Sequence, residues 1–177
     1  GDISERKADE KKIRYLTFHD SLTGIYNRAY FENEMEKYDN LRYLPISIII
    51  GDMNGLKLVN DAFGHDEGDK LLKIAAKCLK ESCRQADTVA RYGGDEFVIL
   101  LPNTTNHEAE VIIERIKNKI SQAQFGPIPL SIALGSETKT IISQDIHLIL
   151  KQAEDKMYQQ KLMSEQSNRS AIISTLE

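Results

Sequence analysis

Two short runs of β-forming residues, separated by a pair of glycines, limit most strongly how this chain can fold. The runs cover Asp87–Tyr92 and Glu96–Leu101, and Gly93-Gly94 lies between them. Apolar and β-branched residues on both sides of a two-glycine turn are typical of a β-hairpin. A third run, Pro45–Gly51, is apolar apart from Ser47, and it predicts a buried central strand. The fold therefore contains a sheet with at least one tight hairpin.

Helical patterns alternate with these strands along the chain. Apolar residues recur at helical spacing in a long lysine-rich segment, with Leu71, Leu72 and Leu79 on one side. A further strand is expected over Pro129–Gly135. This order of elements predicts an α+β fold or a mixed-sheet sandwich. Helices are expected over residues 5–18, 27–38 with Asn27 as N-cap, 68–82, 108–120 capped by Thr104 or Thr105, and 143–163.

Composition excludes several classes of protein. The chain has 177 residues, which indicates one domain, and its net charge of −4 argues against a general electrostatic grip on DNA, RNA or anionic lipid. Cys78 and Cys83 are five apart, which is neither the spacing of a redox pair nor that of a zinc site. No apolar run is long enough to span a bilayer. We therefore expect a cytoplasmic protein that binds neither nucleic acid nor membrane directly.

Three groups of polar residues are candidates for chemistry. Asp52 follows the apolar strand, where a carboxylate can hold a divalent cation or merely cap the next turn. Asp95 and Glu96 follow the two glycines, where a solvated turn is the simpler interpretation because successive strand residues point to opposite faces. The segment 60–69 combines donors and acceptors suited to a nucleobase edge, but it is also an ordinary surface loop in composition.

Together these segments resemble the GGDEF family of diguanylate cyclases, from residue 20 to about residue 161. The combination is specific because the motifs occur in the family's order. The signature itself is present without change at Arg91–Phe97. Before it, the family pattern D-x-L-T-G-L-x-N-R is matched by Asp20–Arg28, D-x-D-x-F-K-x-x-N-D by Asp52–Asp61, and G-H-x-x-G-D by Gly64–Asp69. After it, the pattern A-D-x-A-M-Y-x-A-K is matched by Ala153–Lys161.

The resemblance implies an α+β fold of the nucleotidyl-cyclase palm type, which is a mixed central sheet flanked by helices with the signature on a β-hairpin. It also implies a reaction in which two GTP condense to cyclic di-GMP and release two pyrophosphates. Each active site holds one GTP, so two sites must face each other and a homodimer is needed. Catalysis of this kind depends on positioning and on charge neutralisation by Mg²⁺ or Mn²⁺, with two ions expected per active site.

Roles follow residue by residue from the same resemblance. Asp52, Asp95 and the carbonyl of Met53 would bind the metal. The catalytic residues would be Asp95, Glu96 and Lys57. Gly55, Leu56 and Lys161 would contact phosphates, and Asn60 and Asp69 would read guanine with His65 nearby. Cyclic di-GMP would bind as a feedback ligand at the R-x-x-D pair, Arg84 and Asp87.

Three functions remain open on this sequence. The intact signature favours an active diguanylate cyclase. Glu165, where the family often has a phosphate-binding cation, favours a silent module that binds GTP or cyclic di-GMP. A palm enzyme acting on a single nucleotide is the third, and the R-x-x-D pair counts against it.

The ends of the chain suggest a longer parent. Gly1–Lys7 is similar to the segment that closes PAS sensor domains. Residues 1–19 are therefore expected to form a linker helix, 20–163 the GGDEF domain, and 164–177 a tail leading to a possible further domain, with its apolar patch at Ala171–Ile173 uncovered.

Overall fold

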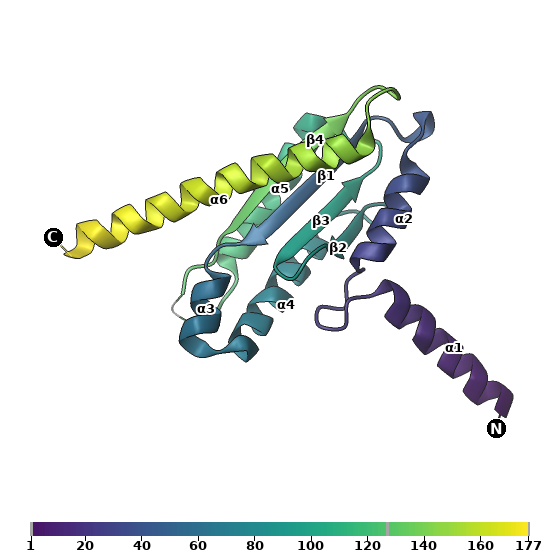
Figure 1. Cartoon of the computed structure of the whole chain (residues 1–177), viewed down its shortest axis with the longest axis horizontal. Coiled ribbons are helices and arrows are strands. Elements are labelled where there is room, and N and C mark those ends of the chain that lie inside the picture. The colour runs from purple at the N-terminus through teal and green to yellow at the C-terminus, as the bar shows by residue number, and fades with distance from the viewer. Residues whose placement is uncertain (1, 127, 177) are drawn as a thin grey trace.

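A four-stranded antiparallel sheet forms the centre of the protein (Figure 1). The computed structural model describes residues 2–126 and 128–176, with side chains up to residue 166. The strand order is β2-β3-β1-β4. The strands are β1 (Ile46–Met53), β2 (Thr88–Arg91), β3 (Glu96–Leu101) and β4 (Ile132–Lys139). The helices are α1 (Asp2–Phe18), α2 (Arg28–Tyr38), α3 (Leu56–Phe63), α4 (His65–Ser82), α5 (Asn106–Gln122) and α6 (Ile146–Leu176), with a 3₁₀ turn at Leu41–Tyr43.

Helices cover both faces of the sheet and give it two hydrophobic cores. On one face, α2 and α6 pack Phe31, Met35 and Met157 against the sheet. On the other face, α3, α4 and α5 supply a larger cluster that includes Leu56, Leu79 and Ile116. The predicted α+β class is confirmed. All paired strands are antiparallel, and the mixed character that we predicted is limited to an isolated parallel bridge between Tyr26 and Ala90.

β1 is the central element of this arrangement. Every residue from Ile46 to Met53 is buried, as expected for a strand covered on both faces. β1 pairs with β3 on one side and β4 on the other. The predicted buried strand is therefore confirmed, and it continues through Asp52.

Glycines account for two of the predicted boundaries that were wrong. α4 begins at His65 rather than at residue 68, because Gly64 ends α3 with a φ of 93° and a new helix starts at once. Gly68 lies within that helix, where a Cβ atom would collide with the Asn60 amide. β4 extends to Lys139, past Gly135, because this glycine lets α6 cross the strand at very close range.

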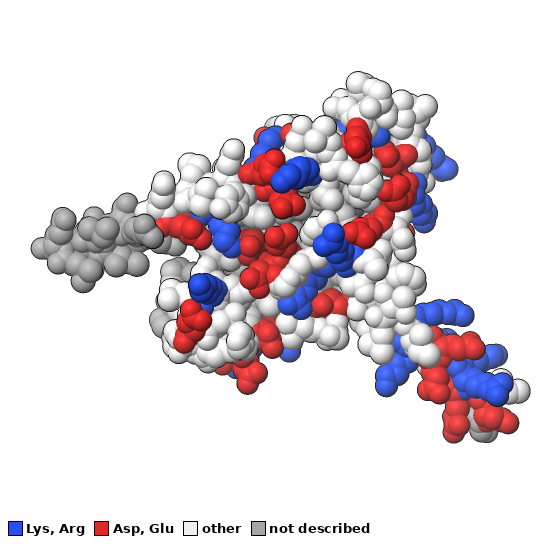
Figure 2. Space-filling model, viewed as in Figure 1, with Lys and Arg blue, Asp and Glu red and all other residues white. Residues whose placement is uncertain are grey.

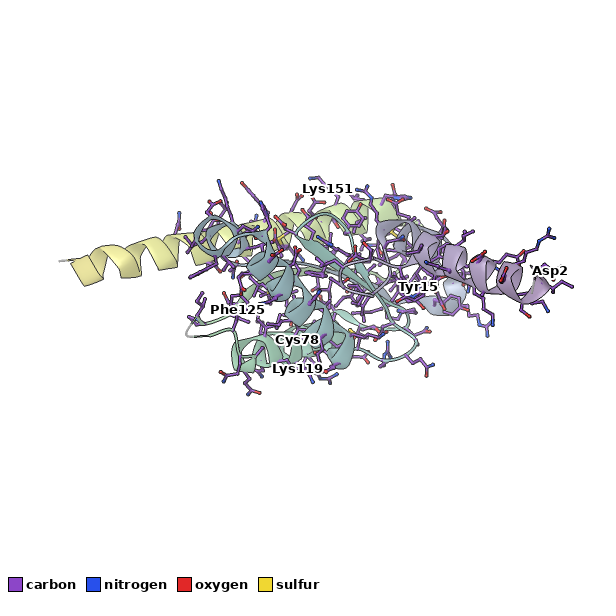
Figure 3. The ribbon with its side chains drawn as sticks, turned by 90° about the horizontal axis from the view of Figure 1, so that it is seen from below. Asp2, Tyr15, Cys78, Lys119, Phe125 and Lys151 are labelled. Carbon is purple, nitrogen blue, oxygen red and sulfur yellow. The ribbon has the colours of Figure 1, made fainter. Side chains whose placement is uncertain are left out.

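The two terminal helices extend beyond the body of the fold. α1 has no buried residue, and Asp2 near its start lies well away from the sheet (Figure 3). α6 runs without interruption across residue 164, where we expected a tail to begin. The side chains of Ala171–Ile173 lie outside the described residues. In the part of the chain that the structure describes, no helix is both long and apolar enough to cross a bilayer.

The contact between α6 and β4 predicts a large effect of a single methyl group. A Cβ at position 135 would meet the Ala153 carbonyl oxygen and the Met157 backbone nitrogen, and backbone atoms cannot move aside easily. We expect Gly135→Ala to lower the free energy of unfolding by about 3 kcal/mol, measured by urea denaturation. Gly94→Ala is the control, since a Cβ there meets nothing within 4 Å. Equal stability of the two variants would contradict this packing.

Candidate functional site

The buried strand and the hairpin bring two carboxylates together. Asp52 lies near the end of β1, and the register places it directly opposite Glu96, the first residue of β3. Asp95 precedes Glu96 at the exposed tip of the hairpin. Two segments more than forty residues apart in sequence thus deliver acidic side chains to one end of the sheet.

Asp52 is a buried carboxylate with one satisfied oxygen. Its Oδ2 atom lies 2.8 Å from the Lys161 ammonium of α6. Its Oδ1 atom is buried and has no hydrogen-bond partner. Burial raises the pKa of Asp52, Lys161 opposes this shift, and the charges of Asp95 and Glu165 add to it. A carboxylate oxygen left bare in this way is a position that a cation can occupy.

Glu96 belongs to the same electrostatic group. Burial raises its pKa, and repulsion from Glu154 and Asp52 raises it further. Figure 2 shows Asp and Glu side chains gathered in the middle of one face, below α6. Sequence reasoning missed Glu154 as a member of the site. Its spacing of seven from Lys161 was a usable signal, because residues seven apart lie on one face of a helix.

One arginine fixes the hairpin that carries Asp95. The Arg91 guanidinium donates to the Gly94 carbonyl at 2.6 Å and 3.1 Å, and its other nitrogen lies 3.3 Å from both carboxylate oxygens of Asp20. Asp20 also accepts hydrogen bonds from the backbone and hydroxyl of Thr23. Arg91 therefore ties the turn before Asp95 to the loop that follows α1. It too was missed as a positioning residue.

The residues expected to bind nucleotide lie on α3 and α4. Gly55, with a φ of 77°, is the N-cap of α3, so the N–H groups of the first two helical residues, Leu56 and Lys57, have no partner within the helix. The Asn60 amide lies over Gly68, which brings it next to Asp69. Lys57 and His65 are exposed. The structure thus places the Asn60 amide against the start of α4. Among the described residues, no hydrogen bond or ion pair joins this group to Asp52.

The acidic group suits a hard divalent cation. Oxygen ligands are those that Mg²⁺ and Mn²⁺ prefer, and the bare Oδ1 of Asp52 is one such ligand. Asp95 and the carbonyl of Met53 are the other expected donors. Within the described residues, no three His, Cys, Asp or Glu side chains are close enough together to hold a metal by themselves. Magnesium usually completes its shell with water and substrate phosphates, so a set of two carboxylates and a carbonyl fits it.

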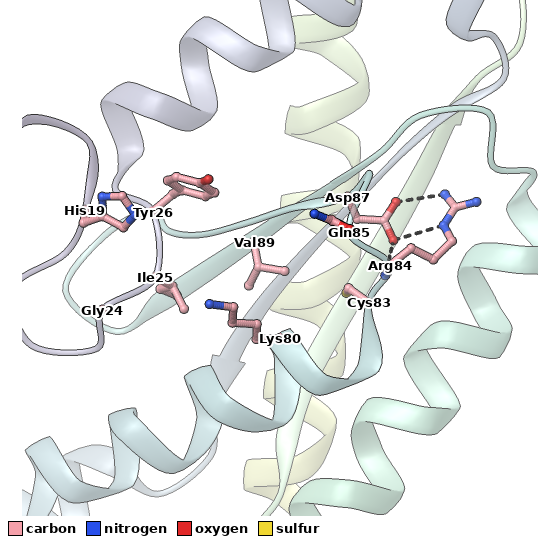
Figure 4. A pocket seen from close by; sticks show the side chains of 10 residues that line it. All are labelled: His19, Gly24, Ile25, Tyr26, Lys80, Cys83, Arg84, Gln85, Asp87 and Val89. Atoms are coloured by element: carbon pink, nitrogen blue, oxygen red, sulfur yellow. Dashed lines mark hydrogen bonds and ion pairs between the residues drawn. The ribbon is translucent and has the colours of Figure 1, made fainter. Parts of the chain in front are cut away.

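A second feature lies at the end of the β2–β3 hairpin that is opposite to its glycine tip. Arg84 donates to Asp87 at 2.8 Å and 3.2 Å, and also to the Pro102 carbonyl and the Thr104 hydroxyl. Both Arg84 and Asp87 line a cavity of about 350 Å³ (Figure 4). The Asp87 side chain is fully buried, whereas that of Arg84 is 49% exposed. In Figure 4 the guanidinium points towards Asp87 and away from Lys80, Ile25 and Tyr26.

Comparison with known proteins places the chain in a family. The family model described as "Diguanylate cyclase, GGDEF domain" matches residues 17–167. The chain belongs to the GGDEF family. This confirms the family resemblance drawn from the motifs and supports a role in cyclic di-GMP signalling.

Curated relatives and solved structures agree with this assignment. The chain is 30% identical over 165 residues to the diguanylate cyclase DgcM of Escherichia coli, covering 90% of this chain and 40% of DgcM. It is 32% identical over 167 residues to the response regulator PleD of Caulobacter vibrioides, covering 89% and 36%. It thus spans less than half the length of these relatives. The coiled coil and GGDEF domain of DgcB from Caulobacter crescentus, solved with c-di-GMP, superposes with a TM-score of 0.81 at 19% identity, covering 88% of this chain and 86% of that one. At that identity the likeness shows the fold alone.

The raised pKa of Glu96 predicts how stability depends on pH. A carboxyl group whose pKa is higher in the folded state costs stability when ionised, and this cost is absent below its unfolded value near 4.5. We expect Glu96→Gln to unfold at a higher temperature than the parent at pH 7. The difference should shrink as the pH falls through the raised pKa and vanish below about 4.

The matched control for this experiment is Glu110→Gln, which removes the same charge from an exposed position on α5. It should change the melting temperature little at any pH. A Glu96→Gln variant that is less stable than the parent at pH 7 would contradict the electrostatic description of the site.

Proposed function

We propose that the domain is a diguanylate cyclase that condenses two GTP to cyclic di-GMP and two pyrophosphates. The observation that carries this proposal is the register of β1 and β3, which sets Asp52 opposite Glu96 beside Asp95. The unpartnered Oδ1 of Asp52 supports a cation at this place. When bound, Mg²⁺ or Mn²⁺ would neutralise charge on the triphosphate.

Residues of this chain would accept the proton, bind the phosphates and recognise the guanine base. Asp95 or Glu96 would accept the proton of the ribose 3′-hydroxyl. The free N–H groups at the start of α3, near Gly55 and Leu56, and the cations Lys57 and Lys161 would bind the phosphates. For Lys161 to do so, it must leave Asp52. Asn60 and Asp69 would read the guanine edge, with His65 beside them.

We propose that two copies form the productive unit in the cytoplasm. Each copy binds one GTP, so each 3′-hydroxyl must meet the α-phosphate held by the other copy. The absence of buried residues in α1 supports its expected role as a linker. The similarity of Gly1–Lys7 to the end of PAS domains supports a PAS sensor in the parent protein.

A silent binding module is the second candidate. Glu165 favours it, because its charge acts on Asp52 and opposes an anionic ligand. Such a module would bind GTP or cyclic di-GMP without turnover. Arg169, a cation four residues further along the chain that would offset this charge, has a side chain outside the described residues.

Nucleotide analysis separates the two candidates. Concentrated protein is incubated with GTP and Mg²⁺ or Mn²⁺, and the products are resolved by chromatography. We expect cyclic di-GMP from the parent and at least about 100-fold less from Asp95→Asn, because a metal ligand and proton acceptor is lost. GTP binding without product across a wide range of protein concentrations would favour the silent module.

We further propose that cyclic di-GMP binds at Arg84 and Asp87 and inhibits the domain. A guanidinium can bind guanine or phosphate with two parallel hydrogen bonds, and Arg84 is half exposed beside a cavity. Burial raises the pKa of the neighbouring Cys83 thiol to about 12, so this group is a neutral part of the wall.

Titration calorimetry with cyclic di-GMP tests this site. Arg84→Ala should weaken binding at least about tenfold, since charged hydrogen bonds are lost. Arg84→Lys keeps the charge without the planar fork and should lie between the two. Because Arg84 also contacts Pro102 and Thr104, melting curves must show that both variants are folded. Unchanged binding of cyclic di-GMP to a folded Arg84→Ala protein would contradict the proposed binding site.

A further inference from the structure

Lys161 is the counter-ion of the buried carboxylate in the candidate site. Its ammonium lies 2.8 Å from Oδ2 of Asp52, and the two side chains come from different elements, α6 and β1. The side chain of Asp52 is 13% exposed and that of Lys161 is 26% exposed. Because solvent and salt screen shielded charges only weakly, this ion pair holds the lysine more firmly than a surface pair would.

Other lysines of α6 show how this position differs. Lys151 pairs with Asp155 of its own helix, and both side chains are exposed. Lys156 is also exposed and pairs with Glu137 of β4. Lys161 is the most shielded of these three lysines, so its partner is not exchanged for water as easily as theirs.

The pair lies within a group of mostly negative charges. Burial raises the pKa of Asp52 and of Glu96, the charge of Asp95 adds to both shifts, and the charge of Lys161 opposes both. Lys161 therefore neutralises part of an acidic group that would otherwise attract a cation from solution.

A divalent cation must share the Asp52 carboxylate with Lys161. Oδ1 of Asp52 is buried and has no partner, so a cation bound there would face the Lys161 ammonium across the same carboxylate. Like charges at this separation repel, and the repulsion is stronger in a shielded position. The cation alone therefore binds less tightly as long as Lys161 stays on Oδ2.

A nucleoside triphosphate would remove this obstacle. Its phosphates carry more negative charge than one carboxylate, and a lysine side chain is flexible enough to move between two anions while the helix backbone stays in place. The N–H groups of Leu56 and Lys57, only four and five residues after Asp52, have no partner within α3 and can hold phosphates near this carboxylate.

We propose that Lys161 keeps the Asp52 carboxylate closed to a divalent cation until the phosphates of a nucleotide draw its ammonium away. Cation and nucleotide then bind cooperatively, and each raises the affinity for the other by the same factor. This inference rests on the proposed function, which places the cation at Asp52 and the phosphates near Lys161. It adds that Lys161 makes the binding of one depend on the other.

Binding of Mn²⁺ without nucleotide tests the proposal. Free Mn²⁺ is measured by electron paramagnetic resonance in solutions of the parent, Lys161→Met and Lys156→Met. Lys161→Met removes the competing charge, so we expect it to bind Mn²⁺ at least about tenfold more tightly than the parent. Lys156→Met removes the same charge from an exposed position on the same helix and should bind Mn²⁺ as the parent does.

Binding of metal and nucleotide together should change in the opposite direction. 3′-Deoxy-GTP lacks the attacking hydroxyl, so calorimetric titration in excess Mn²⁺ proceeds without turnover. We expect its Mn²⁺ complex to bind Lys161→Met at least about threefold more weakly than the parent, because a charged hydrogen bond to phosphate is lost. Equal or tighter binding by Lys161→Met would show that the phosphates do not draw the lysine away, and would overturn the proposal.

Melting temperatures in a chelating buffer test the ion pair itself and show whether the variants are folded. Lys161→Met leaves the Asp52 carboxylate without its partner, so it should melt at least about 3 °C below the parent. The double variant Asp52→Asn/Lys161→Met also removes that carboxylate and should regain most of the loss. Equal melting temperatures of the single and double variants would show that Lys161 does not balance Asp52, and would overturn the proposal.

Failure of this inference is distinguishable from failure of the proposed function. If Lys161→Met and the parent bind Mn²⁺ equally well, the inference is overturned, but the cation site of the proposed function is not. If neither protein binds Mn²⁺, alone or with 3′-deoxy-GTP, both the inference and that cation site are overturned.

Discussion

Burial of β1 on both faces is the constraint on which the site depends. A strand paired on both edges and packed on both faces cannot shift its register without breaking its hydrogen bonds to β3 and β4 and repacking both cores. The same packing that holds Ile48 and Ile50 therefore fixes Asp52 opposite Glu96. The cost of this arrangement appears in the raised pKa values of both carboxyl groups.

The hairpin needs a separate support, because its tip lies outside the sheet. Asp95 is exposed and follows two glycines, which leave the backbone free to adopt many conformations. Arg91 reduces this freedom by binding the Gly94 carbonyl while its charge is balanced by Asp20. Burial would raise the pKa of Asp20, but hydrogen bonds from Thr23 and the charge of Arg91 outweigh it and lower the pKa. One guanidinium thus connects the turn before Asp95 to the loop that follows α1.

Sequence patterns predicted the elements better than the contacts between them. The strands, the hairpin and the Asn27 and Thr105 caps follow from local rules, and the structure has them. The start of α4 and the end of β4 were wrong, because Gly68 and Gly135 serve close packing and do not mark turns. Glu154 and Arg91 were missed as members of the site, since their roles arise only when α6 and the loop at Asp20 fold onto the sheet. The motif match located Asp52 and Lys161, but it did not show that they bind each other.

The pairing of Lys161 with Asp52 changes how Glu165 should be weighed. The two α6 side chains lie one helical turn apart and act on the same carboxylate with opposite sign. The Lys161 ammonium lies 2.8 Å from the Asp52 carboxylate, whereas the charge of Glu165 has the smallest effect on the pKa of Asp52 among the groups that shift it. Coulomb energy falls with distance and with exposure, and Glu165 is exposed. An acid at this position therefore adds a weak repulsion to a site whose character is set by Asp52, Glu96 and Lys161. The departure from the family pattern at residue 165 is a smaller obstacle to an anionic ligand than its charge alone suggests.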